Sequence, residues 1–489
     1  MTEQVRERED KFDVDAAWQL PDLTDALGPD LHLETATIML SSRYYDTVDQ
    51  ALLDNRVTLR KRTGDADVGW QLKVPDGDAR TEIRVPATPS GRAVPRELAD
   101  LVVGLAGGQR LGPVAVIDTR RELSRVIDGQ GAVLAEIADD HVTATTLVGE
   151  STVSSWREVE VELVTGAEEL LASIGDALLQ AGARVAAGPS KLGRVLNPPA
   201  PAAAKSRKGR TLGDTVDDYL QEQFRALMAG DLALRRGNDP IHSTRVAARR
   251  YRSALRVFAD IVDAPRAESL IVELAWYAGL LGEIRDRQVL QRHLDDVIET
   301  LPADLVLGPV AARIDDHLVT GTAKAREQLS RAMRGARYLT LVRELQAWHR
   351  EPPFTGRADK PAAKVQAYLD ASEHMLAKRL RRAAHADADD VALHRTRKAG
   401  KRMRYTAELA EPVLGKPAAR AVQWATGLQD VLGEHQDAVV ASETLLRLGV
   451  ESDAHDSENA FTLGLLYAHE QERAEQTRRR ARKLAKRYA

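Results

Sequence analysis

The chain has 489 residues, enough for two or three domains that each bury a core of their own. It contains no cysteine, which excludes disulfides, zinc–thiolate sites and thiol nucleophiles. The charged start MTEQVREREDKFDV lacks the apolar segment of a secretory signal, and no apolar run approaches the roughly 20 residues of a membrane helix, so we expect a soluble, cytoplasmic protein without a membrane partner.

Charge divides the chain into an acidic first part and a basic second part. Residues 1–200 contain 21 Lys and Arg against 33 Asp and Glu, whereas residues 201–489 contain 48 against 40. Between them the segment NPPAPAAAKSRKGR (197–210) is rich in Pro, Ala, Lys and Arg and has no apolar period, which is typical of a linker. We therefore expect one domain at residues 1–198, a linker at 199–210, and a second domain with a different electrostatic task at 211–489.

Short segments in the first domain alternate polar and apolar residues, and each such segment predicts a β-strand. One helix is expected among them, at residues 167–182, where AEELLASIGDALLQAG has apolar residues at helical spacing. The predicted strands lie at 6–14, 57–62, 69–74, 81–85, 132–139 and 156–164.

Charged side chains recur with period two on these strands. Side chains alternate between the two faces of a strand, so each such set shares one face. Polar and apolar residues would also alternate in a single strand with one face exposed to water. Six strands carrying both acids and bases instead indicate a polar interior, which a closed antiparallel barrel can hold. Acidic walls would bind a hard divalent cation, and Arg and Lys would hold phosphate oxygens, as metal-assisted phosphoryl hydrolysis requires. The charged and polar positions are Glu7, Glu9, Lys11, Arg60, Arg62, Gln71, Lys73, Glu82, Arg84, Glu158, Glu160 and Glu162.

The first domain resembles the CYTH superfamily, the triphosphate tunnel metalloenzymes. EREDK (7–11) is similar to the ExExK signature, and YYDT, LRKR, QLK, AEIADD and EVEVEL follow in the family's order, so the resemblance covers residues 3–198. It implies an eight-stranded antiparallel tunnel that binds triphosphate groups with Mg²⁺ or Mn²⁺, and possible activity as a triphosphatase. The resemblance leaves open which of Glu136, Asp139 and Asp140 faces into the tunnel. By this resemblance Glu7, Glu9 and Lys11 would be catalytic, the metal side would comprise Glu7, Glu9, Asp139, Glu158 and Glu160, and the phosphate side would comprise Lys11, Arg60, Arg62, Lys73, Arg84, Arg121 and Lys191.

The second domain is predicted to be all-helical and duplicated. Apolar residues recur there at spacings of three to four, and HREPPFTGRADKPA (349–362) interrupts them. HSTRVAARRYRSALRVF (242–258) before the break returns after it as HRTRKAGKRMRYTAEL (394–409), and LLGEIRD (280–286) returns as VLGEHQD (431–437). Two motifs that repeat at nearly one offset indicate two copies of one structural unit, at about 211–345 and 363–489.

The repeated basic segment places its cations on one helix face. At about 100° per residue, five cations fall within roughly 80° of arc, namely His242, Arg245, Arg249, Arg252 and Arg256. A solvated charged surface is the alternative, but the repetition and the absence of interleaved acids favour a polyanion ligand. A phosphate polymer fits better than nucleic acid, because aromatic residues, at 4%, are too few for a base-stacking series. The cations are His242, Arg245, Arg249, Arg250, Arg252 and Arg256 in the first copy, and His394, Arg397, Lys398, Lys401, Arg402 and Arg404 in the second, where Glu408 replaces Arg256.

These helices resemble the CHAD domain, an α-helical module that is often fused to CYTH domains. The resemblance covers about residues 206–489 and implies two pseudo-symmetric four-helix bundles that bind inorganic polyphosphate. We therefore expect an α+β multidomain protein that grips polyphosphate with its helices and binds, and hydrolyses, a triphosphate end or a small triphosphate-containing molecule in its tunnel. Two rival hypotheses remain, namely a non-catalytic scaffold of polyphosphate granules, and a nucleotide enzyme such as an adenylate cyclase or a thiamine triphosphatase.

Overall fold

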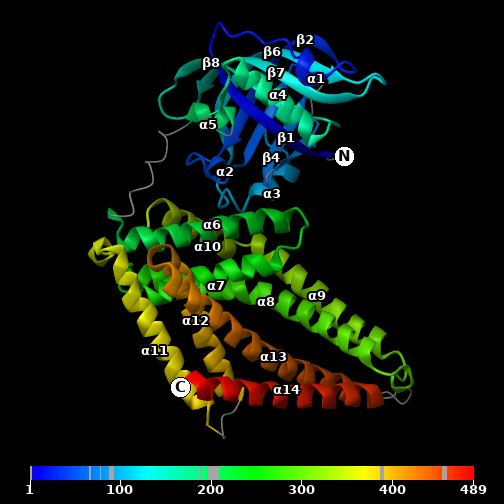
Figure 1. The fold of residues 1–489 in the computed structure, drawn as a ribbon, viewed down its shortest axis with the longest axis vertical. Helices are drawn as coiled ribbons and strands as arrows, with labels where there is room; N and C mark the ends of the chain where they lie inside the picture. Colours follow the sequence, from blue (N-terminus) through cyan, green and yellow to red (C-terminus); the bar gives the residue numbers. More distant parts are fainter. Residues whose placement is uncertain are drawn as a thin grey trace. The chain divides into compact units, whose positions relative to one another are not determined.

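A computed structural model describes residues 3–64, 68–77, 79–86, 93–186, 188, 190–196, 209–385, 390–453 and 460–488 (Figure 1). The chain divides into two compact units, Met1–Ala204 and Lys205–Ala489. Most of the predicted linker, up to residue 208, lies outside the described residues. None of the helices in the described ranges is long and apolar enough to cross a membrane.

The first unit is built on one antiparallel sheet. Within the described residues this sheet contains nine strands, one more than the eight expected. The additional strand is β9, which has two residues and pairs with Phe12 and Asp13 of β1. The order is β5-β4-β3-β2-β6-β7-β8-β1-β9, and β1 also pairs with β5. Residues 3–7 of β1 pair with β5 and residues 8–14 pair with β8, so the ladder returns to β1 through different halves of that strand. The strands are β1 (Glu3–Val14), β2 (His32–Asp46), β3 (Thr58–Thr63), β4 (Gly69–Asp76), β5 (Ala79–Val85), β6 (Gly112–Ile127), β7 (Val133–Thr146), β8 (Val153–Leu163) and β9 (Arg184–Val185).

The two longest strands were not among those predicted from alternation. β2 has 15 residues and β6 has 16, and they pair with each other over most of their length. In β2, HLETATIMLSSRYYD places polar and apolar residues on both faces. Neither face is uniformly buried or exposed along the strand. Period-two reasoning detects a strand only where each face keeps one environment.

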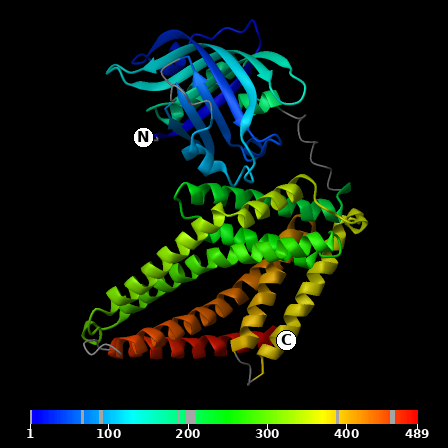
Figure 2. The ribbon, with the colours of Figure 1, turned by 180° about the vertical axis from the view of Figure 1, so that it is seen from behind.

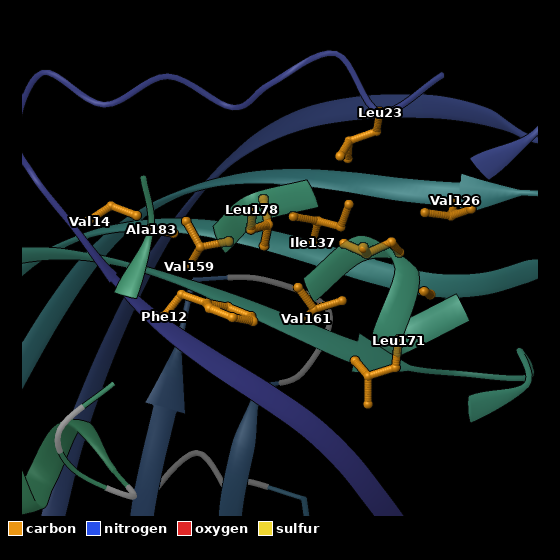
Figure 3. Packing of buried hydrophobic residues seen from close by; sticks show 12 residues of the cluster. Phe12, Val14, Leu23, Val126, Ile137, Val159, Val161, Leu171, Leu178 and Ala183 are labelled. Carbon is orange, nitrogen blue, oxygen red and sulfur yellow. The ribbon is translucent and has the colours of Figure 1, made fainter. Parts of the chain in front are cut away.

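A helix covers part of the outer face of this sheet. Helix α4 (Glu168–Gln180) confirms the helix expected at 167–182. Its apolar side packs on Phe12 and on the face of β7 and β8 that carries Ile137, Val159 and Val161 (Figure 3). The charged residues between these positions therefore point to the other face of the sheet. The remaining helices of this unit are α1 (Thr24–Leu27), α2 (Ala51–Asp54), α3 (Arg96–Val102) and α5 (Lys191–Leu196).

The second unit is all-helical, as expected. A capping box formed by Thr211 and Asp214 starts its first helix. The first copy of the repeat has one helix more than the four predicted, because α10 follows α9 before the Pro-containing break. The first copy comprises α6 (Leu212–Arg235), α7 (Ile241–Val257), α8 (Ala264–Thr300), α9 (Val310–Arg334) and α10 (Ala336–Arg350), and the second comprises α11 (Val365–Ala383), α12 (Asp390–Leu414), α13 (Lys416–Asp453) and α14 (Phe461–Tyr488).

The two copies share an apolar core at the ends of their long hairpins. Leu294 of α8 and Ile314 of α9 pack in one cluster with Leu445 of α13 and Leu466 of α14, and all four side chains are buried. Figure 2 shows these two hairpins meeting at their ends. The basic segments lie on α7 and α12, which pack against each other, so the duplication brings the repeated motifs together.

Candidate functional site

The first site is a cavity of about 340 Å³ inside the sheet of the first unit. All seven predicted phosphate-side residues line it, and so does the predicted catalytic Glu9. They reach it because the strands alternate, with the apolar residues of β1, β7 and β8 turned toward α4 instead. The lining comprises Glu9, Lys11, Tyr44, Thr58, Arg60, Arg62, Lys73, Arg80, Glu82, Arg84, Arg121, Glu136, Glu160, Glu162, Leu163, Val164, Ser190 and Lys191.

One side of the cavity is a network of carboxylates and lysines from β1, β7, β8 and α5. Lys11 Nζ donates to Glu9 at 3.1 Å and also to Glu160. Lys191 Nζ lies 2.8 Å from Glu160 and 2.6 Å from Glu158. Each buried charge on this side therefore has an opposite charge beside it, as burial of ionic groups requires.

These contacts hold both partners in their charged forms. Burial would raise the pKa of Glu160, but Lys11, Lys191 and Arg121 outweigh it and hold that pKa well below its ordinary value. Burial would likewise lower the pKa of Lys11, yet the carboxylates of Glu160 and Glu9 raise it. Glu9 has a lowered pKa, because the charges of Lys11 and Lys73 overcome burial.

The opposite side of the cavity is basic and comes from β3, β4 and β5. Glu82 is almost fully buried and lies between Lys73 at 3.3 Å, Arg60 at 3.8 Å and Arg84 at 2.5 Å. Burial would raise the pKa of Glu82, but these cations lower it to about 2. Burial and the neighbouring charges of Arg60 and Arg121 lower the pKa of Arg62 to about 10. This wall attracts anions, since a ligand anion would relieve the repulsion between its cations.

Asp139, predicted on the metal side, lies on the opposite face of β7. It pairs with Arg157 on the outer face at 2.6 Å. Asp140 is the residue that faces inward, where Arg121 donates to it in a bidentate arrangement, with both distances 2.7 Å, and Lys191 lies 2.9 Å away. The prediction of Asp139 is therefore corrected to Asp140, because neighbouring residues of a strand point to opposite faces. Glu136, the third alternative, faces the same cavity.

The remaining predicted metal-side acids converge on two lysines. Glu9 and Glu160 share Lys11, and Glu160 and Glu158 share Lys191. No group of three acidic or histidine side chains stands ready to coordinate a metal within the described ranges. Ionised carboxylates are nevertheless the donors that hard divalent cations prefer, so the chemistry of this side fits Mg²⁺ or Mn²⁺. The side chain of Glu7 lies outside the described residues.

Arg80 and Tyr44 are two of the lining residues that sequence reasoning did not assign to the cavity. Arg80 follows the same period as Glu82 and Arg84, and this signal could have found it. Tyr44 belongs to β2, which was not predicted as a strand, and its hydroxyl accepts a hydrogen bond from Arg60 Nη1 at 3.2 Å.

The second site is formed by the two basic segments in the second unit. Arg245 and Arg249 of α7 act electrostatically on Lys401 of α12, together with Arg397 and Arg404. Burial and these like charges lower the pKa of Lys401 to about 6. The two predicted stripes therefore face each other, and we call Arg245, Arg249, Arg397, Lys401 and Arg404 the cation cluster.

The centre of the cation cluster has no carboxylate at ion-pair distance among the described residues. Within the described part of the chain, Arg249, Arg397 and Lys401 form no ion pair with a carboxylate. Burial and the charges of Arg245, Arg397 and Arg404 lower the pKa of Arg249. At the edge, by contrast, Arg245 lies 3.2 Å from Asp286. A half-buried group of crowded like charges is unfavourable in the free protein, and an anion would relieve the repulsion.

The other predicted cations surround the cluster. Burial, Arg256 and Arg249 lower the pKa of Arg252. Burial, Arg256 and Arg379 likewise lower the pKa of Arg402. His394 Nδ1 is 2.8 Å from Gln436 Oε1. Lys398 is exposed.

Two arginines that act electrostatically on His242, Arg285 and Arg292, were missed by sequence reasoning. Burial lowers the pKa of His242, and so do Arg285 and Arg292 of α8. Arg285 lies within the segment LLGEIRD, but its counterpart in the second copy is Gln436, so the repeat gave no signal for it.

Glu408, where the second copy departs from the first, forms an anchor beside the cluster. Its carboxylate lies 2.9 Å from Arg250 and 3.2 Å from Arg404. The departure therefore neutralises part of the basic surface at this end.

A repeated glycine explains the second repeated motif. Gly282 lies under the guanidinium of Arg245, and a Cβ there would be 3.2 Å from Arg245 Nε. Gly433 has the same place under Arg397, with a distance of 3.7 Å to Nη2. Gly282 thus leaves room for Arg245 against α8, whereas a Cβ at Gly433 would make an ordinary van der Waals contact with Arg397.

Comparisons with known proteins agree with this division. The family models for the CYTH domain and the CHAD domain match residues 6–188 and 218–446, respectively. Two uncharacterized proteins of Mycobacterium tuberculosis are 34% identical over 96% of this chain and 94% of their own.

Several solved structures match part of this chain. PptA from Streptomyces chartreusis is 21% identical with a TM-score of 0.48, over 57% of this chain and 99% of its own. The CHAD domain from Ricinus communis is 27% identical with a TM-score of 0.45, over 58% and 95%. A candidate adenylyl cyclase from Hippeastrum with a dominant triphosphatase activity is 20% identical with a TM-score of 0.25, over 39% and 94%.

CYTH domains generally depend on a divalent metal, and CYTH and CHAD domains together suggest triphosphate or polyphosphate as the ligand. The sheet with its charged cavity and the duplicated helices with their facing basic segments are the two parts that these families predict. The chain belongs to the proteins in which a CYTH domain is followed by a CHAD domain.

Proposed function

We propose that this protein binds inorganic polyphosphate through the cation cluster of its helical unit and hydrolyses triphosphate groups in the cavity of its sheet, with Mg²⁺ or Mn²⁺ as cofactor. The observation that carries the proposal is the division of the cavity into an ionised carboxylate side and a basic side. A triphosphate bound to metal needs both, since oxygen ligands hold the metal while cations hold the phosphate.

The residues of the cavity divide the work between them. Arg60, Arg62, Lys73 and Arg84 bind the phosphate oxygens and offset the charge that develops on them during transfer. When bound, the metal polarises the terminal phosphoryl group, with Glu9, Glu158, Glu160 and the sequence-predicted Glu7 as its holders. Asp140 keeps Arg121 oriented through its bidentate contact and thereby shapes the site between the two sides.

The helical unit supplies affinity for long chains. Each phosphate unit carries charge, and unpaired Arg and Lys side chains release condensed counter-ions when they bind it. We propose Arg249, Arg397 and Lys401 as contacts at the centre, with His242, Arg245, Arg250, Arg252, Arg256, His394, Lys398, Arg402 and Arg404 around them. The proposed location is the cytoplasm, where polyphosphate granules would offer the long polymer.

Two rival functions make different predictions. A scaffold that coats polyphosphate granules would bind the polymer and release no phosphate. An adenylate cyclase or thiamine triphosphatase would use one nucleotide or thiamine substrate in preference to inorganic chains. The ionised carboxylate side favours an enzyme over a scaffold. A site that only binds phosphate would not need buried acids, because carboxylates repel phosphate.

Phosphate release distinguishes these functions. Full-length protein is supplied with inorganic triphosphate, polyphosphate, ATP or thiamine triphosphate, with Mg²⁺, with Mn²⁺ or with chelator. We expect metal-dependent release from inorganic triphosphate. Absence of release from all four substrates, with polyphosphate binding retained, would favour the scaffold.

A further inference from the structure

We propose that a groove between α13 and α14 is a docking site for an acidic amphipathic helix of a partner protein. The inference does not depend on the proposed function, because no residue of the groove belongs to the charged cavity or to the two basic segments. The groove has a volume of about 530 Å³. Its α13 side includes Trp424, Gly427 and Val431, and its α14 side includes Arg480, Lys483 and Leu484.

The α13 side of the groove is apolar and open. Trp424, Gly427 and Val431 follow one another at spacings of three and four residues, so they share one face of the helix. Gly427 is exposed, and a Cβ at this position would meet no atom within 4 Å. Apolar side chains beside such an open position are typical of a groove that receives the apolar face of another helix.

The repeat defines which face of α8 corresponds to this groove. Gly282 of α8 and Gly433 of α13 lie beside matching arginines, so the two helices can be compared at this register. Six residues before these glycines are Trp276 in α8 and Gly427 in α13. The face of α8 around Trp276 is therefore the counterpart of the groove.

In the first copy, a helix of the chain itself covers this face. Arg337 of α10 lies over the ring of Trp276, 4.2 Å from its centroid, and pairs with Glu273 at 2.7 Å. The ring of Tyr338, also in α10, packs against Tyr277 with centroids 5.1 Å apart. In the second copy, every described residue that lines the groove comes from α13 or α14. We therefore infer that an amphipathic helix is the occupant here as well.

The charge of the groove favours an acidic helix. The first copy presents the carboxylate of Glu273 to a basic helix, whereas the groove presents Arg480 and Lys483, and none of its described lining residues is acidic. Glu434 lies 2.7 Å from Arg480, whose side chain is still 59% exposed. Lys483 is exposed and has no carboxylate at ion-pair distance among the described residues. Acidic side chains at the edge of the incoming helix would pair with these cations, and such complementarity selects the partner.

A peptide made from α10 tests this inference in the full-length protein. It has the 15 residues of α10, with Arg337, Arg343 and Arg350 changed to Glu and the buried apolar residues kept. A staple on its polar side holds the short segment helical. Fluorescence anisotropy of the labelled peptide measures binding at physiological salt. We expect it to bind about tenfold more tightly than a stapled, scrambled peptide of the same composition, because only the first presents one apolar face.

Variants of the protein locate the bound peptide. Gly427→Glu places a carboxylate in the groove and should weaken the acidic peptide by about tenfold. Gly464→Glu on α14 is the matched control, because Gly464 is also exposed and a Cβ there also meets no atom within 4 Å. Its affinity should equal that of wild type. Lys483→Glu should weaken the acidic peptide and strengthen the peptide with the unchanged α10 sequence, since the charge of the groove is then reversed.

Equal affinity for the acidic and the scrambled peptide would overturn the docking site, and so would equal binding by the two glycine variants. Anionic lipid vesicles are tested in parallel. If Gly427→Glu removes vesicle binding, Gly464→Glu retains it and the peptide does not bind, the groove belongs to a membrane surface and the proposed helical partner is wrong.

Discussion

The two sites use opposite electrostatic arrangements for the same kind of ligand. In the cavity of the sheet every acid has a cation beside it, and the pKa values of Glu160 and Lys11 move so that both stay charged. In the cation cluster the pKa values of Arg249 and Lys401 move toward the neutral form, because these side chains are partly buried and like charges crowd together. The cavity is stable without a ligand and is organised for chemistry. The cluster is destabilised without a ligand and is organised for binding.

The largest effect should come from removing one acid of the cavity. Glu9→Gln is expected to reduce metal-dependent phosphate release by about 100-fold or more, since it takes away an ionised oxygen on the metal side. The amide has nearly the same shape, so the melting temperature should hold. Steady-state phosphate release with Mg²⁺ and a thermal melt check this.

Glu122→Gln serves as its matched control, because Glu122 lies on the outer face of β6, 48% exposed and paired with Arg120. Turnover in this variant should equal that of wild type. Full turnover in Glu9→Gln would show that the carboxylate side is structural.

The second effect concerns the salt dependence of polyphosphate binding. Replacing Arg245, Arg249 and Arg252 by Ala should flatten the log–log salt slope by about one unit per lost contact. Because unfavourable repulsion is relieved, the melting temperature should stay or rise. Titration of long-chain polyphosphate at several salt concentrations measures the slope.

The same changes in the second copy, at Arg397, Lys401 and Arg404, should flatten the slope as well if the two stripes form one surface. Arg331→Ala on α9, 63% exposed, is the control and should leave the slope unchanged. Preference for single-stranded nucleic acid over polyphosphate at physiological salt would instead indicate a nucleic-acid site.

A third prediction follows from Lys401, whose pKa in the free protein is about 6. A bound polyanion should raise that pKa, so at pH 7.5 binding should take up close to one proton per site, and affinity should increase as the pH falls from 8 to 6. Calorimetry in buffers of different ionisation enthalpy counts the protons. Lys401→Met should abolish the uptake, whereas Lys398→Met, on the exposed part of the same helix, should retain it.

The same group makes a prediction for stability. Between pH 6 and the ordinary lysine range, Lys401 is neutral when folded but protonated when unfolded, so the unfolded state binds more protons and the free energy of unfolding rises with pH. Relative to Lys401→Met, wild type should gain at most about 1.4 kcal/mol per pH unit above pH 6. A pH-independent difference between the two would contradict the crowding of charge at Lys401.

The smallest effect should come from the glycine under Arg245. Gly282→Ala is expected to weaken polyphosphate binding a few-fold, because the new Cβ would lie 3.2 Å from Arg245 Nε and push the guanidinium aside. It should also stabilise α8 by about 0.5–1 kcal/mol, since Ala is the better helix former. Gly279→Ala on the same helix meets no atom within 4 Å and should stabilise without weakening binding. Equal binding by both variants would refute a positioning role for Gly282.

The order of families, the charged strands and the duplication could be predicted from the sequence. Period-two charges predicted that Glu9, Lys11, Arg60 and Lys73 share an interior, and all of them line the cavity. Their chemical roles stay predictions. Asp139 was the error, because alternation fixes a face only when the register is known, and a slip of one residue reverses it.

The sequence by itself determined which residues carry charge and with what period, because these properties are local. It therefore determined the two families and the basic stripes on α7 and α12. The inward place of Asp140 and the lowered pKa of Lys401 were decided only by the tertiary structure. Each of these depends on groups distant in the sequence, brought together by strand register and helix packing, and the field that such groups produce at one another is absent from the chain before it folds.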